Sequence, residues 1–472
     1  MTSLTFYGGV NEIGGNKILL EDKDTKVFLD FGKSFSQRGA YFDEFMSPRL
    51  STGMKDFFEM GLLPDLQGVY RTDLLQMMER TDTETDIDAV LLTHAHADHA
   101  DYISFLHEDI PVYMGETCKL ILEAIERRSS RTFEREILSF KPRPDKKAEP
   151  IDRDINTFRT GDKFKIGSLE VAPIHVDHSV PGAYGFIIYT SSGPVVYTGD
   201  IRLHGTNPKM TEDFVKKAIE VKPIALLAEG TRIDDLETDE SEAKVYSECN
   251  EHVSKSDKLA IADFNFKDMD RLRTFYNIAK ENDRKFVVDV KDAAYLEYLS
   301  KDPQLNVPKP DDENIEIFAP KKSSWKKFEK EYLTGSNITT AEDIVKRQNK
   351  SLCAFSFWHF GALIDIKPKP GALYLHSLSE PFNDEGVFDQ KRVNMWLDHF
   401  GLNRIQSHCS GHSKGNDLLE IVKGIDAKML YPIHTENPDA YKKVTDKITI
   451  VEIGKKYEMQ IPTIIFIGFT LF

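Results

Sequence analysis

Residues 89–99 read AVLLTHAHADH, a short apolar run that ends in three histidines and an aspartate. Such a run bounded by polar residues is typical of a buried strand. Side chains alternate in an extended loop, so His94 and His96 can bind one cation while Asp98 and His99 turn toward a second. Imidazole and carboxylate are ligands that zinc prefers and that manganese also accepts. The sequence therefore predicts a metal site directly after this strand.

Three further candidate ligands lie where an apolar, strand-like run stops. His178 ends LEVAPIHVDH, Asp200 ends PVVYTGD and His434 ends KMLYPIH. One such residue alone is more often a turn former or a cap. The set points to metal, because the histidine cluster needs partners from elsewhere to complete two metal shells. We therefore predict that these strand ends converge.

The composition indicates a globular protein with more than one domain. The chain has 472 residues, of which 40% are hydrophobic, and this length exceeds that of one ordinary domain. No apolar run approaches the roughly 20 residues of a membrane helix, and residues 1–15 do not resemble a signal peptide. The four cysteines lie far apart, so we expect a reducing cytoplasm and no disulfide framework.

The net charge of −16 argues against a protein that coats nucleic acid non-specifically, because phosphate neutralisation needs clustered Lys and Arg. It does not exclude a nuclease, since bound divalent cations supply positive charge at the cut site. A local basic surface is also compatible with an acidic total.

Two patterns alternate along the chain. Up to about residue 230, short apolar runs predict a strand-rich region with helices near 100–108 and 117–129. Helix-like and strand-like stretches then alternate, which predicts βαβ units and a parallel sheet. From about residue 386 the first pattern returns. We therefore predict a first domain over 1–230, an inserted domain over 231–385 and a closing part of the first domain over 386–472.

Residues 34–86 fit neither pattern. They are rich in Phe, Met and Tyr, which favours a helical insertion packed by those side chains. Long excursions from a compact domain are also typical of lids, so a lid beside the site stays a second interpretation.

The ordered ligand set resembles the metallo-β-lactamase superfamily. This resemblance implies an α/β fold, an αββα sandwich, with two divalent cations, zinc first and manganese second. It implies that one cation is held by His94, His96 and His178, the other by Asp98, His99 and His434, with Asp200 bridging them. Asp30, in FLDFG, matches the aspartate that orients a ligand in that family.

The resemblance narrows to the β-CASP nucleases, with their inserted parallel-sheet domain, and within them to ribonuclease J. The matching segments are GGVNEIGGN (8–16), HSVPGAYGFII (178–188), TGDIR (198–202), Glu229 in ALLAEG, HCSGH (408–412) and PIH (432–434). The chain departs from the family in the length of residues 34–86 and in HSLSEPFNDE (376–385), where a segment with Gly and Gln is expected.

These motifs imply a metal-dependent RNA phosphodiesterase, acting as a 5′–3′ exoribonuclease, an endoribonuclease or both. Asp98 and Asp200 are expected to act with the metals, which activate water. His412 is the expected proton donor to the leaving oxygen, since histidine titrates near neutral pH. Its other interpretation is a residue that orients His434 or a carboxylate, and Glu229 is expected to orient a metal-binding histidine.

Substrate contacts are predicted on both sides of the cleft. Backbone and side-chain groups of Ser410, Gly411 and His412 can hold a phosphate next to the following helix start, or form an ordinary glycine turn. Candidates on the face of the inserted domain are Ser377, Ser379 and His359, with Phe357 and Trp358 for base stacking or simply for the core.

Two other functions stay open. A hydrolase of a small phosphodiester, thioester or lactone on the same fold is favoured by the acidic charge, but it needs no second domain over its cleft. A silent scaffold or RNA-binding subunit is expected to lose metal ligands, and all seven are present. We therefore predict RNA as partner, no membrane, and a homodimer as a further possibility.

Overall fold

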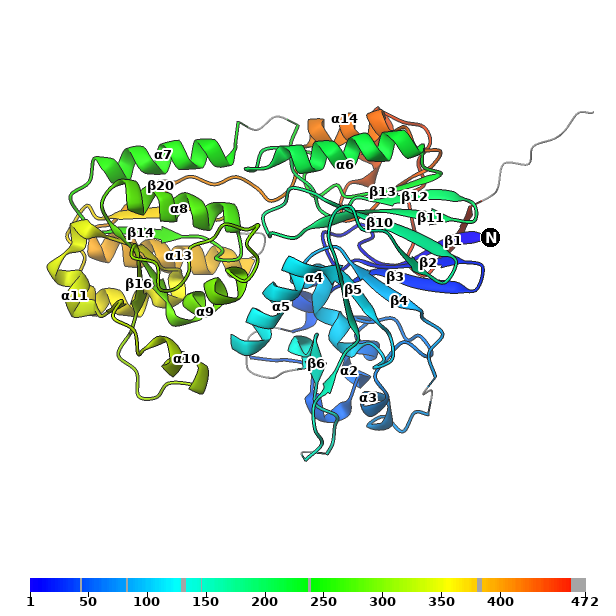
Figure 1. Cartoon of the computed structure of the whole chain (residues 1–472), viewed down its shortest axis with the longest axis horizontal. Coiled ribbons are helices and arrows are strands. Elements are labelled where there is room, and N and C mark those ends of the chain that lie inside the picture. The colour runs from blue at the N-terminus through cyan, green and yellow to red at the C-terminus, as the bar shows by residue number, and fades with distance from the viewer. Residues whose placement is uncertain are drawn as a thin grey trace, which may run out of the picture.

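The computed structural model describes residues 1–42, 45–81, 84–128, 133–145, 147–236, 239–379 and 384–459. Its elements form two lobes side by side (Figure 1). The first lobe holds two sheets packed face to face, and the second lobe holds one sheet between helices. The predicted fold class, an αββα sandwich with an inserted parallel-sheet region, is confirmed.

The first sheet of the first lobe has the strand order β22-β1-β2-β3-β4-β5-β8. Its strands are β1 (Thr2–Gly8), β2 (Lys17–Asp22), β3 (Thr25–Phe31), β4 (Ala89–Leu92), β5 (Val112–Gly115), β8 (Ile155–Phe158) and β22 (Lys456–Met459). β4 lies in the parallel half and is buried at all four positions. A strand covered on both faces reads as a continuous apolar run, which explains the AVLL signal.

The second sheet has the order β21-β13-β12-β11-β10-β9. Its strands are β9 (Phe164–Ile166), β10 (Leu169–His175), β11 (Tyr184–Thr190), β12 (Gly193–Tyr197), β13 (Ala225–Ala228) and β21 (Leu430–Pro432). Leu29 of β3 and Phe186 of β11 meet in the buried core between the sheets. Helices α6 (Pro208–Val221) and α14 (Gly415–Ile425) cover the outer face of the second sheet, and α5 (Glu116–Arg128) packs outside the first.

The second lobe contains a fully parallel sheet of order β17-β16-β15-β18-β14-β19-β20. Its strands are β14 (Ala260–Asp263), β15 (Lys285–Asp289), β16 (Ile315–Phe318), β17 (Ile338–Thr339), β18 (Ser351–Ala354), β19 (Leu373–His376) and β20 (Asn403–Gln406). One face packs on α7 (Glu242–Ser254), α8 (Met269–Glu281) and α9 (Val290–Leu299). The other packs on α11 (Ala341–Lys346), α12 (Leu363–Ile366) and α13 (Asp384–Phe400).

The predicted boundary between residues 385 and 386 needs correction. β20 pairs in parallel with β19, and Val393 and Leu397 of α13 lie in the core of the second lobe. α13 and β20 therefore belong to the second lobe and not to the closing part of the first. Periodicity identifies a helix and a strand but does not say which sheet they join, so the sequence could not place this boundary.

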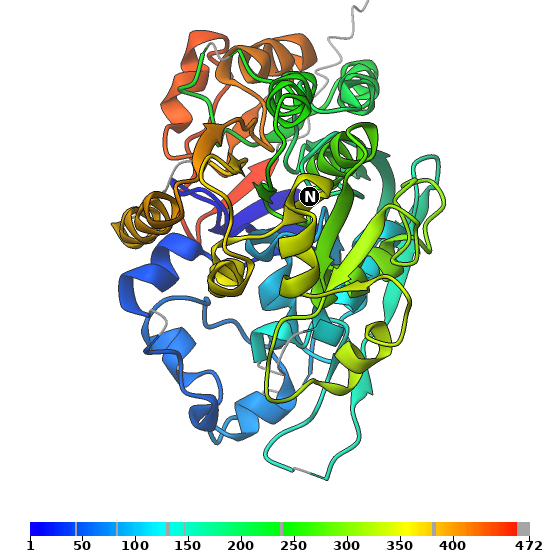
Figure 2. The ribbon, with the colours of Figure 1, turned by 90° about the vertical axis from the view of Figure 1, so that its left-hand side faces the viewer.

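Residues 34–86 form short helices on the outer face of the first sheet, seen in blue in Figure 2. They are α1 (Phe35–Tyr41), α2 (Lys55–Glu59) and α3 (Thr72–Gln76), with a 3₁₀ turn at Leu50–Thr52. Phe57 and Leu74 are buried in the core, whereas α1 has no buried residue. The lid interpretation stays a prediction. No helix in the described ranges has the length and apolar character needed to cross a membrane.

Candidate metal centre

The loop after β4 changes conformation between its two pairs of candidate ligands. His96 has an extended backbone, with φ −73° and ψ 150°, and the short helix α4 (Ala97–Ala100) begins directly after it. His94 and His96 therefore lie on the extended part, while Asp98 and His99 lie on the helical turn. This change of backbone is what separates the two pairs into two clusters.

The first cluster contains His94, His96, His178 and Asp200, whose ligand atoms all lie within 4.8 Å of one another. Nδ1 of His96 is 3.1 Å from His94 Nε2 and 3.0 Å from His178 Nε2. His178 Nδ1 donates to the carbonyl oxygen of Gly411 over 2.5 Å, so the lone pair of the neutral ring lies on Nε2, toward the cluster. Burial, followed by the charge of neighbouring histidines, holds the pKa of His178 well below its usual range.

The second cluster contains Asp98, His99 and His434. His434 Nε2 is 3.1 Å from Asp98 Oδ2, and His99 Nε2 is 3.8 Å from the same oxygen. His99 Nδ1–H donates a hydrogen bond to Asp30 Oδ2 over 2.7 Å, which directs Nε2 of His99 into the cluster. Asp30 thus takes the orienting position that the family resemblance implies.

Asp200 lies between the clusters. Its Oδ2 atom is 3.1 Å from His99 Nε2 and 3.5 Å from His94 Nε2. Burial alone would raise the pKa of Asp200, but His434 and His99 outweigh burial and hold it well below the usual range. This carboxylate is therefore ionised and shared by both groups of histidines.

The residues present fit a pair of divalent cations. Within the described part of the chain, His99 Nε2 and Asp200 Oδ1 are buried without a hydrogen-bond partner. Buried polar atoms normally have partners, so two orphan atoms in one donor set mark a binding site. Nitrogen and carboxylate oxygen are the donors that zinc and manganese take.

His412 adjoins the shared carboxylate and is held by Glu229. Its Nδ1 atom lies 2.8 Å from Glu229 Oε2, and its Nε2 atom lies 4.0 Å from Asp200 Oδ2. Burial alone would lower the pKa of His412, but Glu229 and Asp200 outweigh burial and raise it to about 9. Glu229 also accepts from Thr231 Oγ1, which lies 2.8 Å from His434 Nδ1. Glu229 therefore positions His412 directly and His434 through Thr231.

Comparison with known sequences matches residues 64–240 to the Beta-lactamase superfamily domain. The chain contains a metallo-β-lactamase domain. The resemblance predicted from the motifs is thereby confirmed, and curated ribonuclease J proteins are among its relatives.

Three such relatives differ in how much of the chain they match. Ribonuclease J of Sinorhizobium meliloti is 24% identical over 405 residues, 79% of this chain and 62% of that protein. The Mycoplasma genitalium protein is 21% identical over 458 residues, 92% of this chain and 68% of its own. The Mycobacterium tuberculosis protein is 29% identical over 208 residues, 43% of this chain and 29% of its own. The chain thus spans less than two thirds of the first and third relatives.

A crystal structure of a protein of unknown function from Enterococcus faecalis V583 has the same fold. It superposes with a TM-score of 0.74 at 22% identity and covers 97% of this chain and 99% of its own. The two-lobed arrangement is therefore shared over nearly the whole of both chains.

The loop 408–412 supports the metallo-β-lactamase centre through its backbone. The carbonyl oxygen of Ser410 accepts from His204 Nε2 over 2.9 Å, and the Ser410 hydroxyl accepts from the backbone NH of His412. A Cβ atom on Gly411 would lie 2.6 Å from the hydroxyl of Ser179. A larger residue at this position would therefore require the side chain of Ser179 to shift. The predicted phosphate contact of this turn stays a prediction.

The two serines predicted on the opposite face differ. Ser377 is buried, and its hydroxyl contacts Arg271 and the carbonyl oxygen of Ser407. The prediction that Ser377 contacts substrate is therefore wrong, because its hydroxyl is already used inside the protein. Ser379 is exposed and stays a prediction.

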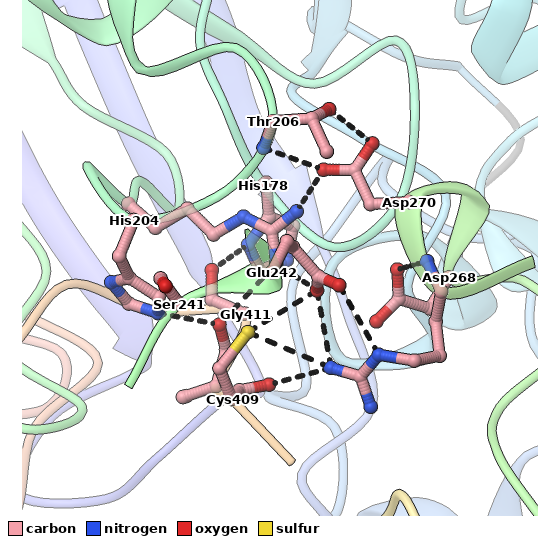
Figure 3. Close-up of polar contacts among 12 residues, drawn as sticks. His178, His204, Thr206, Ser241, Glu242, Asp268, Asp270, Cys409 and Gly411 are labelled. Carbon is pink, nitrogen blue, oxygen red and sulfur yellow. Dashed lines mark hydrogen bonds and ion pairs between the residues drawn. The ribbon is translucent and has the colours of Figure 1, made fainter. Parts of the chain in front are cut away.

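A buried arginine network that sequence reasoning missed lies beside the centre (Figure 3). Arg202 donates to Asp177 over 3.0 Å and to Asp270 over 2.6 Å. Arg271 donates to Glu242 over 3.1 Å and to the carbonyl oxygen of Cys409 over 3.3 Å. The network joins both lobes to the loop 408–412. Its one visible signal was an arginine two residues after Asp200.

Proposed function

We propose that the protein is a two-metal hydrolase that cleaves RNA phosphodiester bonds. The observation that carries the proposal is the meeting of seven ligand side chains in two adjoining clusters. Two of these ligands, His99 and Asp200, each have a buried polar atom without a hydrogen-bond partner. One cation is assigned to His94, His96 and His178, the other to Asp98, His99 and His434, with Asp200 shared. Zinc is the first candidate and manganese the second.

Bound divalent cations supply an activated water and stabilise charge on the phosphate oxygens. The protein holds its ligands ready for this role. Asp30 fixes the tautomer of His99, and the carbonyl oxygen of Gly411 fixes that of His178. Such hydrogen bonds behind the ligands keep each lone pair directed into the site.

His412 is the proposed proton donor to the leaving oxygen. Glu229 holds its Nδ1 atom, and the opposite ring nitrogen, Nε2, is 4.0 Å from Asp200. A proton on Nε2 therefore lies beside the carboxylate shared by both metal clusters. This geometry is that of a general acid supported by a carboxylate behind it.

RNA as substrate is supported by two features. Relatives over most of the chain are named ribonuclease J, and Arg271 of the second lobe contacts His408 and Cys409 in the loop that carries His412. A hydrolase of small phosphodiesters is the second candidate, favoured by the net charge of −16.

The decisive experiment offers both substrate classes to the purified protein with zinc or manganese. The substrates are 5′-monophosphorylated RNA, 5′-triphosphorylated RNA and bis(p-nitrophenyl) phosphate. We expect metal-dependent cleavage of RNA, with mononucleotides from a 5′ exonuclease and internal fragments from an endonuclease. Hydrolysis of the small diester without cleavage of either RNA would overturn the ribonuclease assignment.

A further inference from the structure

A cavity of about 630 Å³ lies on the first lobe and is lined by residues other than the seven metal ligands. Helix α5 forms one wall, and the hairpin of β6 (Ser139–Phe140) and β7 (Ile151–Asp152) forms another (Figure 1). Tyr298 of α9 completes the lining from the second lobe. Small-ligand sites have volumes of about 300–1,000 Å³, so the cavity is large enough for a small metabolite.

Arg153, which lines this cavity, is a buried arginine without an acidic partner. Its side chain is fully used only in part, because the residue is 5% exposed and just two of its nitrogens are bonded. Nη1 and Nη2 donate to the carbonyl oxygens of His107 and Ser104, each over 3.1 Å. Among the described residues, Nε has no hydrogen-bond partner and the guanidinium forms no ion pair. Buried charges are normally paired, so Arg153 is an exception that a bound anion would explain.

The pKa of Arg153 indicates that the fold does not compensate this charge. Burial, followed by the charge of Arg71, lowers the pKa of Arg153 to about 9. Both guanidinium groups lie over the ring of Phe140, at 3.8 Å for Arg71 and 5.1 Å for Arg153. Burial alone would also lower the pKa of Arg202 and Arg271, but neighbouring carboxylates outweigh burial and raise it. A bound anion would do for Arg153 what those carboxylates do for the other two.

The remaining charged groups of the cavity also favour an anion. Of the carboxyl groups, Glu136 already pairs with two arginines that do not line the cavity, and burial raises the pKa of Glu126 to about 7. Three of the cations pair with carboxylates. In the described ranges Lys141 and Arg153 form no ion pair, so two cations are left for a ligand. The charged lining residues are Lys119, Arg127, Arg135, Lys141 and Arg153, with Glu123, Glu126, Glu136 and Asp152.

We propose that this cavity binds a phosphate dianion, free or carried by a small metabolite, against Arg153 and Lys141. Two unpaired cations match the charge of a phosphate monoester, which is about −1.5 to −2 at pH 7. The planar guanidinium of arginine presents its donors in a fork that suits phosphate oxygens. The inference does not rest on RNA as the substrate, because none of these groups belongs to the metal centre.

The test is isothermal titration calorimetry of the metal-loaded protein with ribose 5-phosphate and with inorganic phosphate. Phosphate can also bind the metals, so wild type should bind one equivalent more than Arg153→Met, which keeps the metal centre. Asp98→Ala with His99→Ala should retain this equivalent, because it removes only metal ligands. Tighter binding of ribose 5-phosphate would identify a metabolite as the occupant, and equal affinity would identify free phosphate.

A second variant, Lys119→Ala with Lys141→Ala, tests the cavity without removing a fully buried group. It should weaken binding by about 10- to 150-fold, the factor for one hydrogen bond to a charged group. The matched control is Lys209→Ala with Lys217→Ala, which removes the same charge from the exposed surface of α6 and should bind like wild type. Equal binding in wild type and both cavity variants would overturn the proposal, as would loss of the additional equivalent together with the metal ligands.

Discussion

The metal centre and the arginine network share the loop 408–412, but they differ in whether their buried charged groups are fully paired within the chain. In the network, Arg202 and Arg271 are fully buried and bond to Asp177, Asp270 and Glu242. In the metal centre, carboxylates and histidines crowd together and leave orphan atoms on His99 and Asp200. Buried ions are tolerated when they are fully paired. The network is therefore complete by itself, whereas the centre is built for a ligand that the chain does not supply.

Removing ligands from the centre should have the largest effect on function. Asp98→Ala with His99→Ala takes away two of the three groups in the second cluster. We expect loss of metal, measured by plasma mass spectrometry, and hydrolysis at background level. Lys209→Ala with Lys217→Ala is the control. Activity at wild-type level in the ligand variant would defeat the metal assignment.

Breaking the network should instead act on stability. Arg271→Met leaves Glu242 buried without its main partner, which costs about 3–5 kcal/mol when one member of a buried ion pair is removed. Urea unfolding of the metal-loaded protein measures this loss. Arg271→Met with Glu242→Met should recover much of the stability, because no unpaired charge remains. If the single variant unfolds like wild type, the network is not the closed ion-pair system described above.

His412 belongs to the loop 408–412, which the metal centre and the arginine network share. Replacing it tests whether it acts as a proton donor or supports metal binding. His412→Ala should keep the metal content and slow turnover by about 10²–10⁴-fold, the contribution of a general acid. Metal analysis and kcat on the same preparation separate the two interpretations. A fall in metal content in this variant would instead make His412 a ligand or a support of His434, with which Glu229 connects it through Thr231.

The same comparison explains what the sequence could predict. His178, Asp200 and His434 each follow an apolar strand run, so they could be recognised as members of a ligand set, although none of them could be identified alone. Arg271 could not be recognised, because a charged residue in a helical pattern normally faces water, and only tertiary packing buries it. Ser377 was misassigned for this reason, since its hydroxyl is used by Arg271. The strand β20 was recognised, but its sheet was not, because strand pairing is long-range.

The smallest expected effect is on stability, and it comes from a single carboxyl group that has no cationic partner in this comparison. Glu126 on α5 accepts from the backbone NH of Leu138 over 2.6 Å, and burial raises its pKa to about 7. The folded state thus holds this proton more tightly than the unfolded state. The protonated Glu126 carboxyl therefore contributes fully to the free energy of unfolding at low pH, and this contribution is lost as the pH rises from about 4.5 through 7. Glu126→Gln should therefore gain stability over wild type, on the order of 1–2 kcal/mol at pH 8 and little at pH 5. Urea unfolding at both pH values measures the difference, and an equal effect at the two would show that Glu126 is ionised in the folded protein at pH 5.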